Sequence, residues 1–263
     1  MLSSIDLDAL SRRDRLLIPA CILLTTALAW AYLIHLGRGV AAGAEYDRMM
    51  AAMGMSTNKP WTVTDLFFTF AMWAVMMIGM MGPAGAPVLM LFAAAAAKQG
   101  RDRAPGMTLV FGLGYVAVWS VFSVGAAATQ GALQRAAVLS TALSISSRWV
   151  AGTILLGAGV YQLSPWKDQC LAHSRSPLGF FLSHWRAGRT GAFRMGFRHG
   201  LYCLGCCWAL MCVLFAVGVM NLVWVAALTG LVLLEKTGPA GVAAARVGGA
   251  AMVVWGIVQI VHG

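Results

Sequence analysis

The stretch RHGLYCLGCCWALMCVLFAVGVMN, residues 198–221, decides the fold class. After its first two residues it carries no charged side chain for about 20 residues, the length that an α-helix needs to cross the hydrocarbon core of a bilayer. Similar apolar runs recur along the chain. We therefore predict an all-α, polytopic bundle of transmembrane helices, formed by a single domain that covers residues 1–263.

The composition supports the same class of protein. Hydrophobic residues make up 60% of the chain and charged residues only 11%, whereas a soluble domain needs more charge on its surface. The net charge of +10 does not indicate nucleic-acid binding, because the basic residues lie between apolar runs, where they set topology and meet anionic headgroups. The expected partner is the lipid bilayer, and no nucleic acid.

The apolar runs predict six or seven spans. They lie at about residues 16–36, 63–98, 107–129, 144–163, 200–220, 222–234 and 242–261. The count is six if residues 201–234 form one long bent helix. We expect the second span to be interrupted at Pro83 and Pro87, because proline removes a helical hydrogen bond. A polar loop, residues 164–198, precedes the fifth span.

The distribution of Lys and Arg predicts the orientation. The N-terminal tail, residues 98–103 and the loop 164–198 carry twelve of them, whereas the segments on the other side carry five. Positive charge stays in the cytoplasm. We therefore predict a protein of the bacterial inner membrane with a cytoplasmic N-terminus, and a cysteine cluster at the cytoplasmic end of the fifth span.

That cluster, C-x-x-C-C, carries the chemistry of the chain. Residues four apart share one face of a helix, and this rule places a run of soft ligands on one face. We predict a metal site formed by Cys203, Cys206, Cys207, His199 and Met211. Soft sulfur ligands favour Cu(I), and also Zn(II) or another thiophilic metal. We take Cu(I) as the foremost candidate, bound for delivery or transport.

Two alternatives stay open for the cysteines. They can pack as small residues at a helix crossing, as in an accessory subunit of a larger membrane complex. Cys203 and Cys206 can also form the redox pair of a thiol oxidoreductase or another thiol-dependent enzyme, because the start of a helix favours a thiolate. The chain has no P-loop, zinc-protease motif or nucleophile elbow, so no enzyme class is indicated.

A methionine-rich stretch in the second span offers further soft ligands. Its members are Met72, Met76, Met77, Met80 and Met81. Thioethers bind Cu(I) weakly, so we expect the face formed by Met72, Met76 and Met80 to lie against the fifth span as a path that leads to the thiols. The alternative is that these methionines fill gaps in the core. Glu235 and Lys236, which end an apolar run, are expected to pair or to anchor at a membrane face.

Three segments resemble a bacterial family of predicted metal-binding integral membrane proteins, the domain of unknown function 2182. They are AVMMIGMMGPAGAP at 74–87, GAGVYQLSPWKDQCLAHSRSPLGFF at 157–181 and GLYCLGCCWALMCVLFAVGVMNLVWVAALTGLVLLEK at 200–236. The resemblance implies a helical membrane fold with a copper-related metal site. It carries over to Cys203, Cys206, Cys207, Met211, Met220, Asn221 and Cys170. The second loop cysteine of that family, near Ser174, is absent here. For delivery, the expected partner is a membrane protein or metalloprotein.

Overall fold

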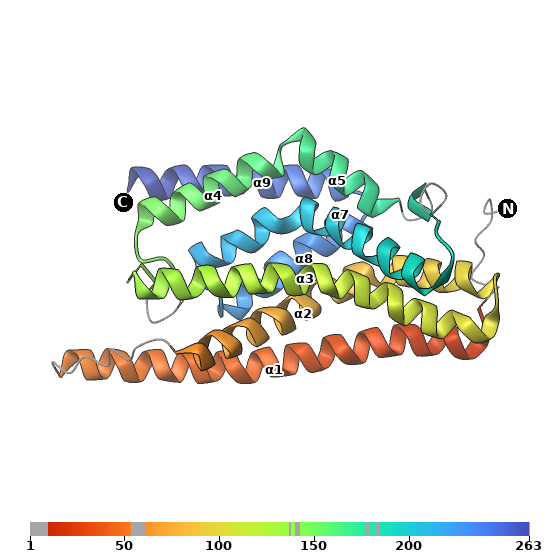
Figure 1. Cartoon of the computed structure of the whole chain (residues 1–263). Coiled ribbons are helices and arrows are strands. Elements are labelled where there is room, and N and C mark those ends of the chain that lie inside the picture. Colours follow the sequence, from red (N-terminus) through yellow and green to blue (C-terminus); the bar gives the residue numbers. More distant parts are fainter. Residues whose placement is uncertain are drawn as a thin grey trace.

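A computed structural model of the chain describes residues 10–53, 62–136, 138–139, 143–176, 179–181 and 185–262. These residues form long helices that lie roughly side by side (Figure 1). The helices are α1 (Arg12–Ala52), α2 (Val63–Ala97), α3 (Ala104–Arg135), α4 (Arg148–Gln162), α5 (Pro165–Arg175), α7 (Gly188–Val217), α8 (Leu222–Thr237) and α9 (Gly241–Val261). The all-α class is therefore confirmed.

Helices α2, α3, α7 and α8 occupy the middle of the bundle (Figure 1). Helix α1 lies along one side and packs on α2, whereas α4 and α9 pack against each other on the opposite side. Helix α5 covers part of α7. The two segments that carry soft ligands, α2 and α7, are thus both enclosed by other helices.

Five helices of the described residues are long and apolar enough to cross a membrane, namely α1, α2, α3, α7 and α9. Helices α4 and α8 have 15 and 16 residues, fewer than the roughly 20 that a span needs. A multi-pass membrane protein is therefore plausible from the lengths and compositions of its helices, and the count of six or seven spans stays a prediction.

Local signals in the sequence set several helix ends. Thr62 accepts a hydrogen bond from the backbone of Asp65, whose carboxylate accepts one from the backbone of Thr62, which makes a capping box at the start of α2. Gly218 ends α7 with φ of 102°, a conformation that favours glycine. Residues 201–234 are therefore divided between two helices, and the alternative of one long helix is wrong.

The expected interruption of the second span is also wrong. Helix α2 continues from Val63 to Ala97 with Pro83 and Pro87 inside it. Neighbouring helices in a bundle tolerate such prolines by offering partners to backbone groups. Here the Tyr115 hydroxyl of α3 lies 3.4 Å from the carbonyl oxygen of Met81, two residues before Pro83.

The polar segment 164–198 has more regular structure than a loop. Ser164 caps α5 and Pro165 occupies its first turn, which is a favoured start for a helix. Helix α7 begins at Gly188 rather than near Gly200. Cys203 therefore lies near the middle of a helix of 30 residues, so the cluster does not stand at the start of this helix as predicted. Its depth in the membrane stays a prediction.

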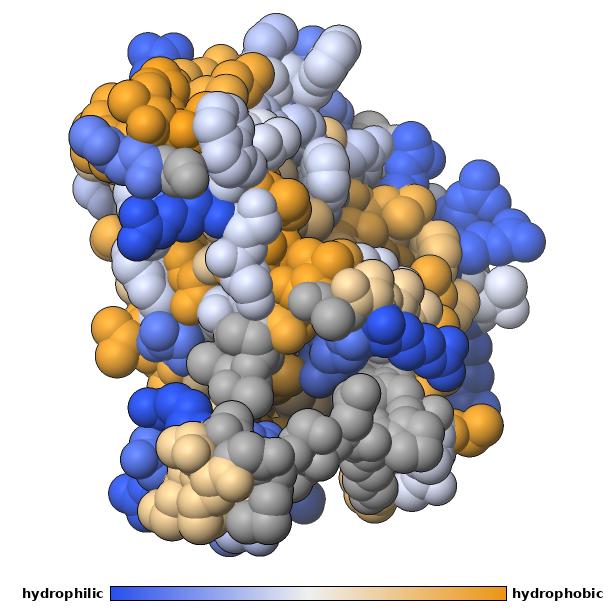
Figure 2. Space-filling view, turned by 90° about the vertical axis from the view of Figure 1, so that its left-hand side faces the viewer, coloured by the Kyte–Doolittle hydropathy of each residue, from blue (hydrophilic) through white to orange (hydrophobic). Residues whose placement is uncertain are grey.

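The three basic segments lie toward one end of the bundle. The start of α1, the connection between α2 and α3, and the start of α7 all lie toward the right-hand side of Figure 1. Figure 2 shows the opposite end, where hydrophilic patches are interspersed with apolar surface. The grouping agrees with the charge pattern, and the side of the membrane stays a prediction.

Glycines let α3 and α7 cross at backbone contact. A Cβ atom on Gly196 would stand 1.9 Å from the carbonyl oxygen of Phe111, and one on Gly114 would stand 2.3 Å from that of Phe193. Small residues at such crossings are typical of membrane helices. This close approach brings Tyr115 of α3 against the cysteines of α7.

Candidate metal centre

The soft ligands of α7 are enclosed within the bundle. His199 is 2% exposed, Cys203 0%, Cys207 1% and Met211 0%. The methionines of α2 are buried with the three cysteines in one apolar cluster, and they are Met72, Met76, Met77, Met80 and Met81. The methionines and the thiols therefore belong to the same buried cluster, and a path between them stays a prediction.

Two of the thiols point back toward the preceding turn of their own helix. The Sγ atoms of Cys206 and Cys207 lie 3.1 Å and 2.9 Å from the backbone carbonyl oxygen of Cys203, to which both donate. These bonds satisfy a weak donor inside an apolar core. They also keep the two neighbouring thiols within one turn of Cys203.

A thiol of α7 and a thioether of α2 face each other. The Sγ atom of Cys207 lies 4.0 Å from the Sδ atom of Met81. With metal–sulfur bonds of about 2.3 Å, two sulfurs at this separation can share one ion with an angle of about 120° between the bonds. This angle suits the low coordination numbers of a soft ion between sulfur ligands.

The methionine that makes this contact was not singled out by the helical pattern. The row Met72, Met76 and Met80 was expected to face the cysteines, but the contact comes from Met81, which belongs to the next row of the same helix. The reason is the placement of α2, because α2 and α7 each pack closely on α3 rather than along each other's length.

The third sulfur, that of Cys203, is held by two polar groups. The hydroxyl of Tyr115 lies 2.9 Å from its Sγ atom and the Nζ atom of Lys236 lies 2.7 Å from it. Tyr115 comes from α3 and Lys236 from the end of α8. The side chain of Cys203 therefore lies at a junction of three helices.

The expected pair of Glu235 and Lys236 does not form. Glu235 instead binds Lys167 of α5, with 2.7 Å between Oε2 and Nζ, and both side chains are buried. Gln162 of α4 donates to the other carboxylate oxygen. Neighbouring residues on a helix point in different directions, so Glu235 faces α4 and α5 whereas Lys236 faces the thiols.

Several predicted ligands are not assembled around one point. Among the described residues, no three His, Cys, Asp or Glu side chains are arranged to hold a metal ion. The His199 ring lies among those of Phe111, Tyr115 and Phe180, and its Nδ1 atom has no hydrogen-bond partner in the described part of the chain. Asn221 is exposed at the start of α8.

Cys170 approaches α7 from the other side. Its Sγ atom would stand 2.9 Å from a Cβ atom on Gly205, so it packs directly on the helix that carries the cluster. Burial raises the pKa of the Cys170 thiol above its ordinary value, and the nearby Cys206 adds to this effect. Cys170 therefore stays a neutral thiol at pH 7. Met220, the remaining predicted residue, is buried in the same cluster as the cysteines.

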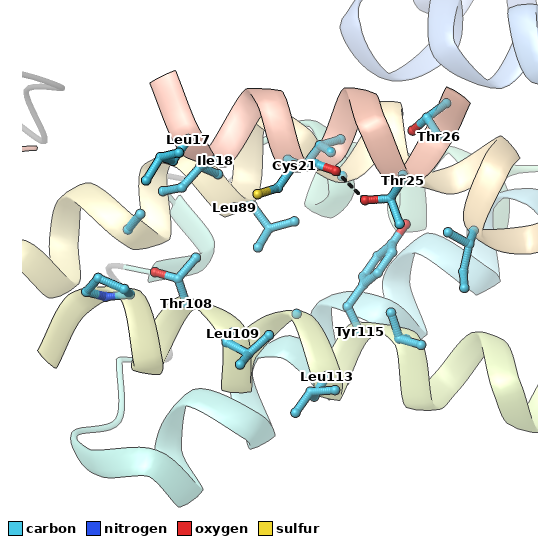
Figure 3. A pocket seen from close by; sticks show the side chains of 18 of the residues that line it. Leu17, Ile18, Cys21, Thr25, Thr26, Leu89, Thr108, Leu109, Leu113 and Tyr115 are labelled. Carbon is cyan, nitrogen blue, oxygen red and sulfur yellow. Dashed lines mark hydrogen bonds between the residues drawn. The ribbon is translucent and has the colours of Figure 1, made fainter. Parts of the chain in front are cut away.

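An apolar cavity of about 460 Å³ borders the candidate site. It is lined by residues of α1, α2 and α3, among them Met81 and Tyr115. Figure 3 shows Leu17, Ile18 and Cys21 of α1 on one side of the cavity and the ring of Tyr115 at one end. The two residues that touch the thiols are thus also accessible from this cavity.

Tyr115 and Lys236 are the participants that sequence reasoning missed. The sequence did mark Lys236 as a functional candidate, since it is an ionisable residue beside an apolar run. The sequence pattern did not predict which neighbouring helix its side chain faces. Tyr115 carried no signal, because its position depends on the glycine contacts between α3 and α7.

Comparison with known proteins gives one match. A family model described as PpoB2, copper chaperone, matches residues 70–259. No curated protein matches the chain, and no solved structure does. The match confirms the copper-related part of the family resemblance and does not bear on the name domain of unknown function 2182.

Proposed function

This chain belongs to the PpoB2 family of copper chaperones, and from that premise we propose that it binds Cu(I) within the membrane and delivers it. The proposed ligands are the thiolate of Cys207 and the thioether of Met81, with Cys203 as the next sulfur. The observation that carries the proposal is the 4.0 Å separation between the two facing sulfur atoms.

The chemistry of these groups supports Cu(I) over harder ions. Thiolate and thioether are soft ligands that select Cu(I), whereas oxygen ligands suit Mg²⁺ and Ca²⁺. The two carboxylate oxygens of the nearby Glu235 are already engaged by Lys167 and Gln162. A soft, monovalent ion therefore suits this buried place better than a hard divalent ion.

The methionines of α2 support a path for delivery. Met72 and Met81 are separated by about 14 Å along the helix at 1.5 Å per residue, and Met76, Met77 and Met80 lie between them, all buried. Neutral thioethers bind the ion weakly, so they suit passage between sites. We propose that Cu(I) moves along this row between one end of the bundle and Cys207.

The proposed setting is the inner membrane of a bacterium. The five apolar helices and the basic segments gathered toward one end support a multi-pass protein with its N-terminus in the cytoplasm. A recipient for the ion is then a membrane protein or a metalloprotein. The alternative of a thiol oxidoreductase loses its main argument, because Cys203 and Cys206 lie far from the N-terminus of α7.

A competition titration tests the proposed ligands. The full chain in detergent micelles, kept anaerobic, is titrated with Cu(I) against a chromophoric chelator. We expect one Cu(I) per chain for wild type and an affinity at least tenfold lower for Cys207→Ser and for Met81→Leu.

Matched variants control for general damage to the fold. Cys212→Ser changes a thiol of the same helix that has no partner in the proposed site, and Met90→Leu changes a thioether of α2 in a different apolar cluster. Both should bind as wild type does. Equal affinities for all four variants, or no bound copper in wild type, would refute the proposal.

A further inference from the structure

The cation of Lys236 is directed at the thiol cluster from outside helix α7. Its Nζ atom lies 2.7 Å from the Sγ atom of Cys203. No carboxylate of the described residues forms an ion pair with Lys236. Its neighbour Glu235 is engaged by Lys167, at 2.7 Å, and so does not serve as its counter-ion.

The side chain of Lys236 is partly buried, and a cation that is partly withdrawn from water is stabilised by a compensating charge nearby. The sulfurs and the phenol near Lys236 belong to Cys203, Cys206, Cys207 and Tyr115. His199 and Glu235 also lie within electrostatic reach of Lys236, but Glu235 is paired with Lys167. The site therefore contains one fixed positive charge before any metal enters it.

We infer that Lys236 makes the site selective for a monovalent soft cation over a divalent one. This inference rests on the proposed function. Thiols lose their protons when they bind a metal, so Cys203 and Cys207 together contribute two negative charges. Lys236 balances one of them, and an ion such as Cu(I) or Ag(I) balances the other. The loaded site is then neutral.

A divalent ion leaves one positive charge without a partner. Zn(II) or Cd(II) with two thiolates and Lys236 has a net charge of +1, which is costly in a membrane interior. A third thiolate would restore the balance, but no three cysteines of the described residues are arranged to hold one ion. Sulfur ligands alone would bind both the monovalent and the divalent soft ions. The charge of Lys236 therefore favours the monovalent ion over the divalent one.

Competition between Ag(I) and Cd(II) tests this inference. Both ions bind thiolates, neither is redox-active under these conditions, and their charges differ by one. The full chain in micelles is titrated with each ion, and binding is followed by the thiolate-to-metal absorption in the ultraviolet and by metal analysis of the isolated protein. The readout is the ratio of the Ag(I) affinity to the Cd(II) affinity.

We expect this ratio to fall at least tenfold in Lys236→Gln, because removal of the cation favours the divalent ion more than the monovalent ion. Lys236→Arg keeps the charge and should keep the ratio within about twofold. If Lys236→Gln does not elute as a folded species, Lys236→Leu, which needs no hydrogen-bond partner, takes its place with the same expected ratio.

The outcomes separate this inference from the proposed function. Ag(I) binding that is lost in Cys207→Ser, combined with an unchanged ratio in the Lys236 variants, refutes the role of Lys236 alone. Binding of neither ion to wild type, or binding that Cys207→Ser does not weaken, overturns the proposed site and this inference with it. A wild type that binds Cd(II) as tightly as Ag(I) also refutes the charge selection.

Discussion

Substitution of Gly196 by alanine should separate α3 from α7. A Cβ atom at this position would stand 1.9 Å from the carbonyl oxygen of Phe111, whereas ordinary contacts begin near 3.4 Å. The obstacle is backbone, which no side-chain rotation removes, so the helices must move apart by more than about 1 Å. We expect the free energy of unfolding to fall by about 1–3 kcal/mol, the usual cost of overpacking.

The same movement should disturb the metal site. The hydroxyl of Tyr115 lies 2.9 Å from the Sγ atom of Cys203 only because the two helices touch, and a displacement of about 1 Å weakens this contact. We therefore expect Gly196→Ala to weaken Cu(I) binding as well as stability.

The assay compares thermal unfolding of purified variants in one detergent, followed by circular dichroism. Gly125→Ala is the matched control, since it lies in α3 and a Cβ atom there meets nothing within 4 Å. It should be as stable as wild type or slightly more so, because alanine favours helix over glycine. A Gly196→Ala protein as stable as Gly125→Ala would refute the argument from backbone contact.

Four further predictions concern single side chains. Glu235→Gln leaves the buried ammonium of Lys167 without its carboxylate, so we expect a loss of about 3–5 kcal/mol in unfolding free energy, most of it recovered when Lys167→Met is added. Thr62→Ala removes the capping box of α2 and should cost about 1 kcal/mol in the same unfolding assay; no change would contradict the cap. Tyr115→Phe removes a hydroxyl that contacts Cys203, and a loss of about 1 kcal/mol is expected. Because burial raises the pKa of Cys170 and the thiolate is the reactive form, its alkylation rate, measured by mass spectrometry, should rise with pH around a midpoint above the usual value of about 8.5; a midpoint at or below that value would contradict the prediction.

The sequence was sufficient for the class of fold and for the choice of chemistry. Apolar runs of spanning length predicted an all-α bundle, and the spacing of the cysteines predicted their shared face on one helix. The sequence did not predict that helix α2 is continuous, because its two prolines indicated an interruption. The bundle instead keeps the helix continuous, because contacts with neighbouring helices, which no local pattern encodes, offset the cost of Pro83 and Pro87.

Which residues contact the thiols depends on how the helices pack against one another. Helix α7 begins at Gly188, inside a polar segment that the sequence predicted to be a loop. The cysteines therefore lie near the middle of this helix rather than at its start. Met81 and Lys236 reach the thiols through the directions of α2 and α8. Such directions follow from packing between helices, and the sequence periodicity of one helix does not contain them.

The central claim is that sulfur atoms from α7 and α2 hold Cu(I) together, and X-ray absorption at the copper edge tests it most directly. The full chain loaded with one equivalent of Cu(I) should show a shell of sulfur atoms at about 2.3 Å, with one sulfur fewer in Met81→Leu and in Cys207→Ser. A shell of nitrogen or oxygen atoms, or a sulfur count unchanged by both substitutions, would contradict the account.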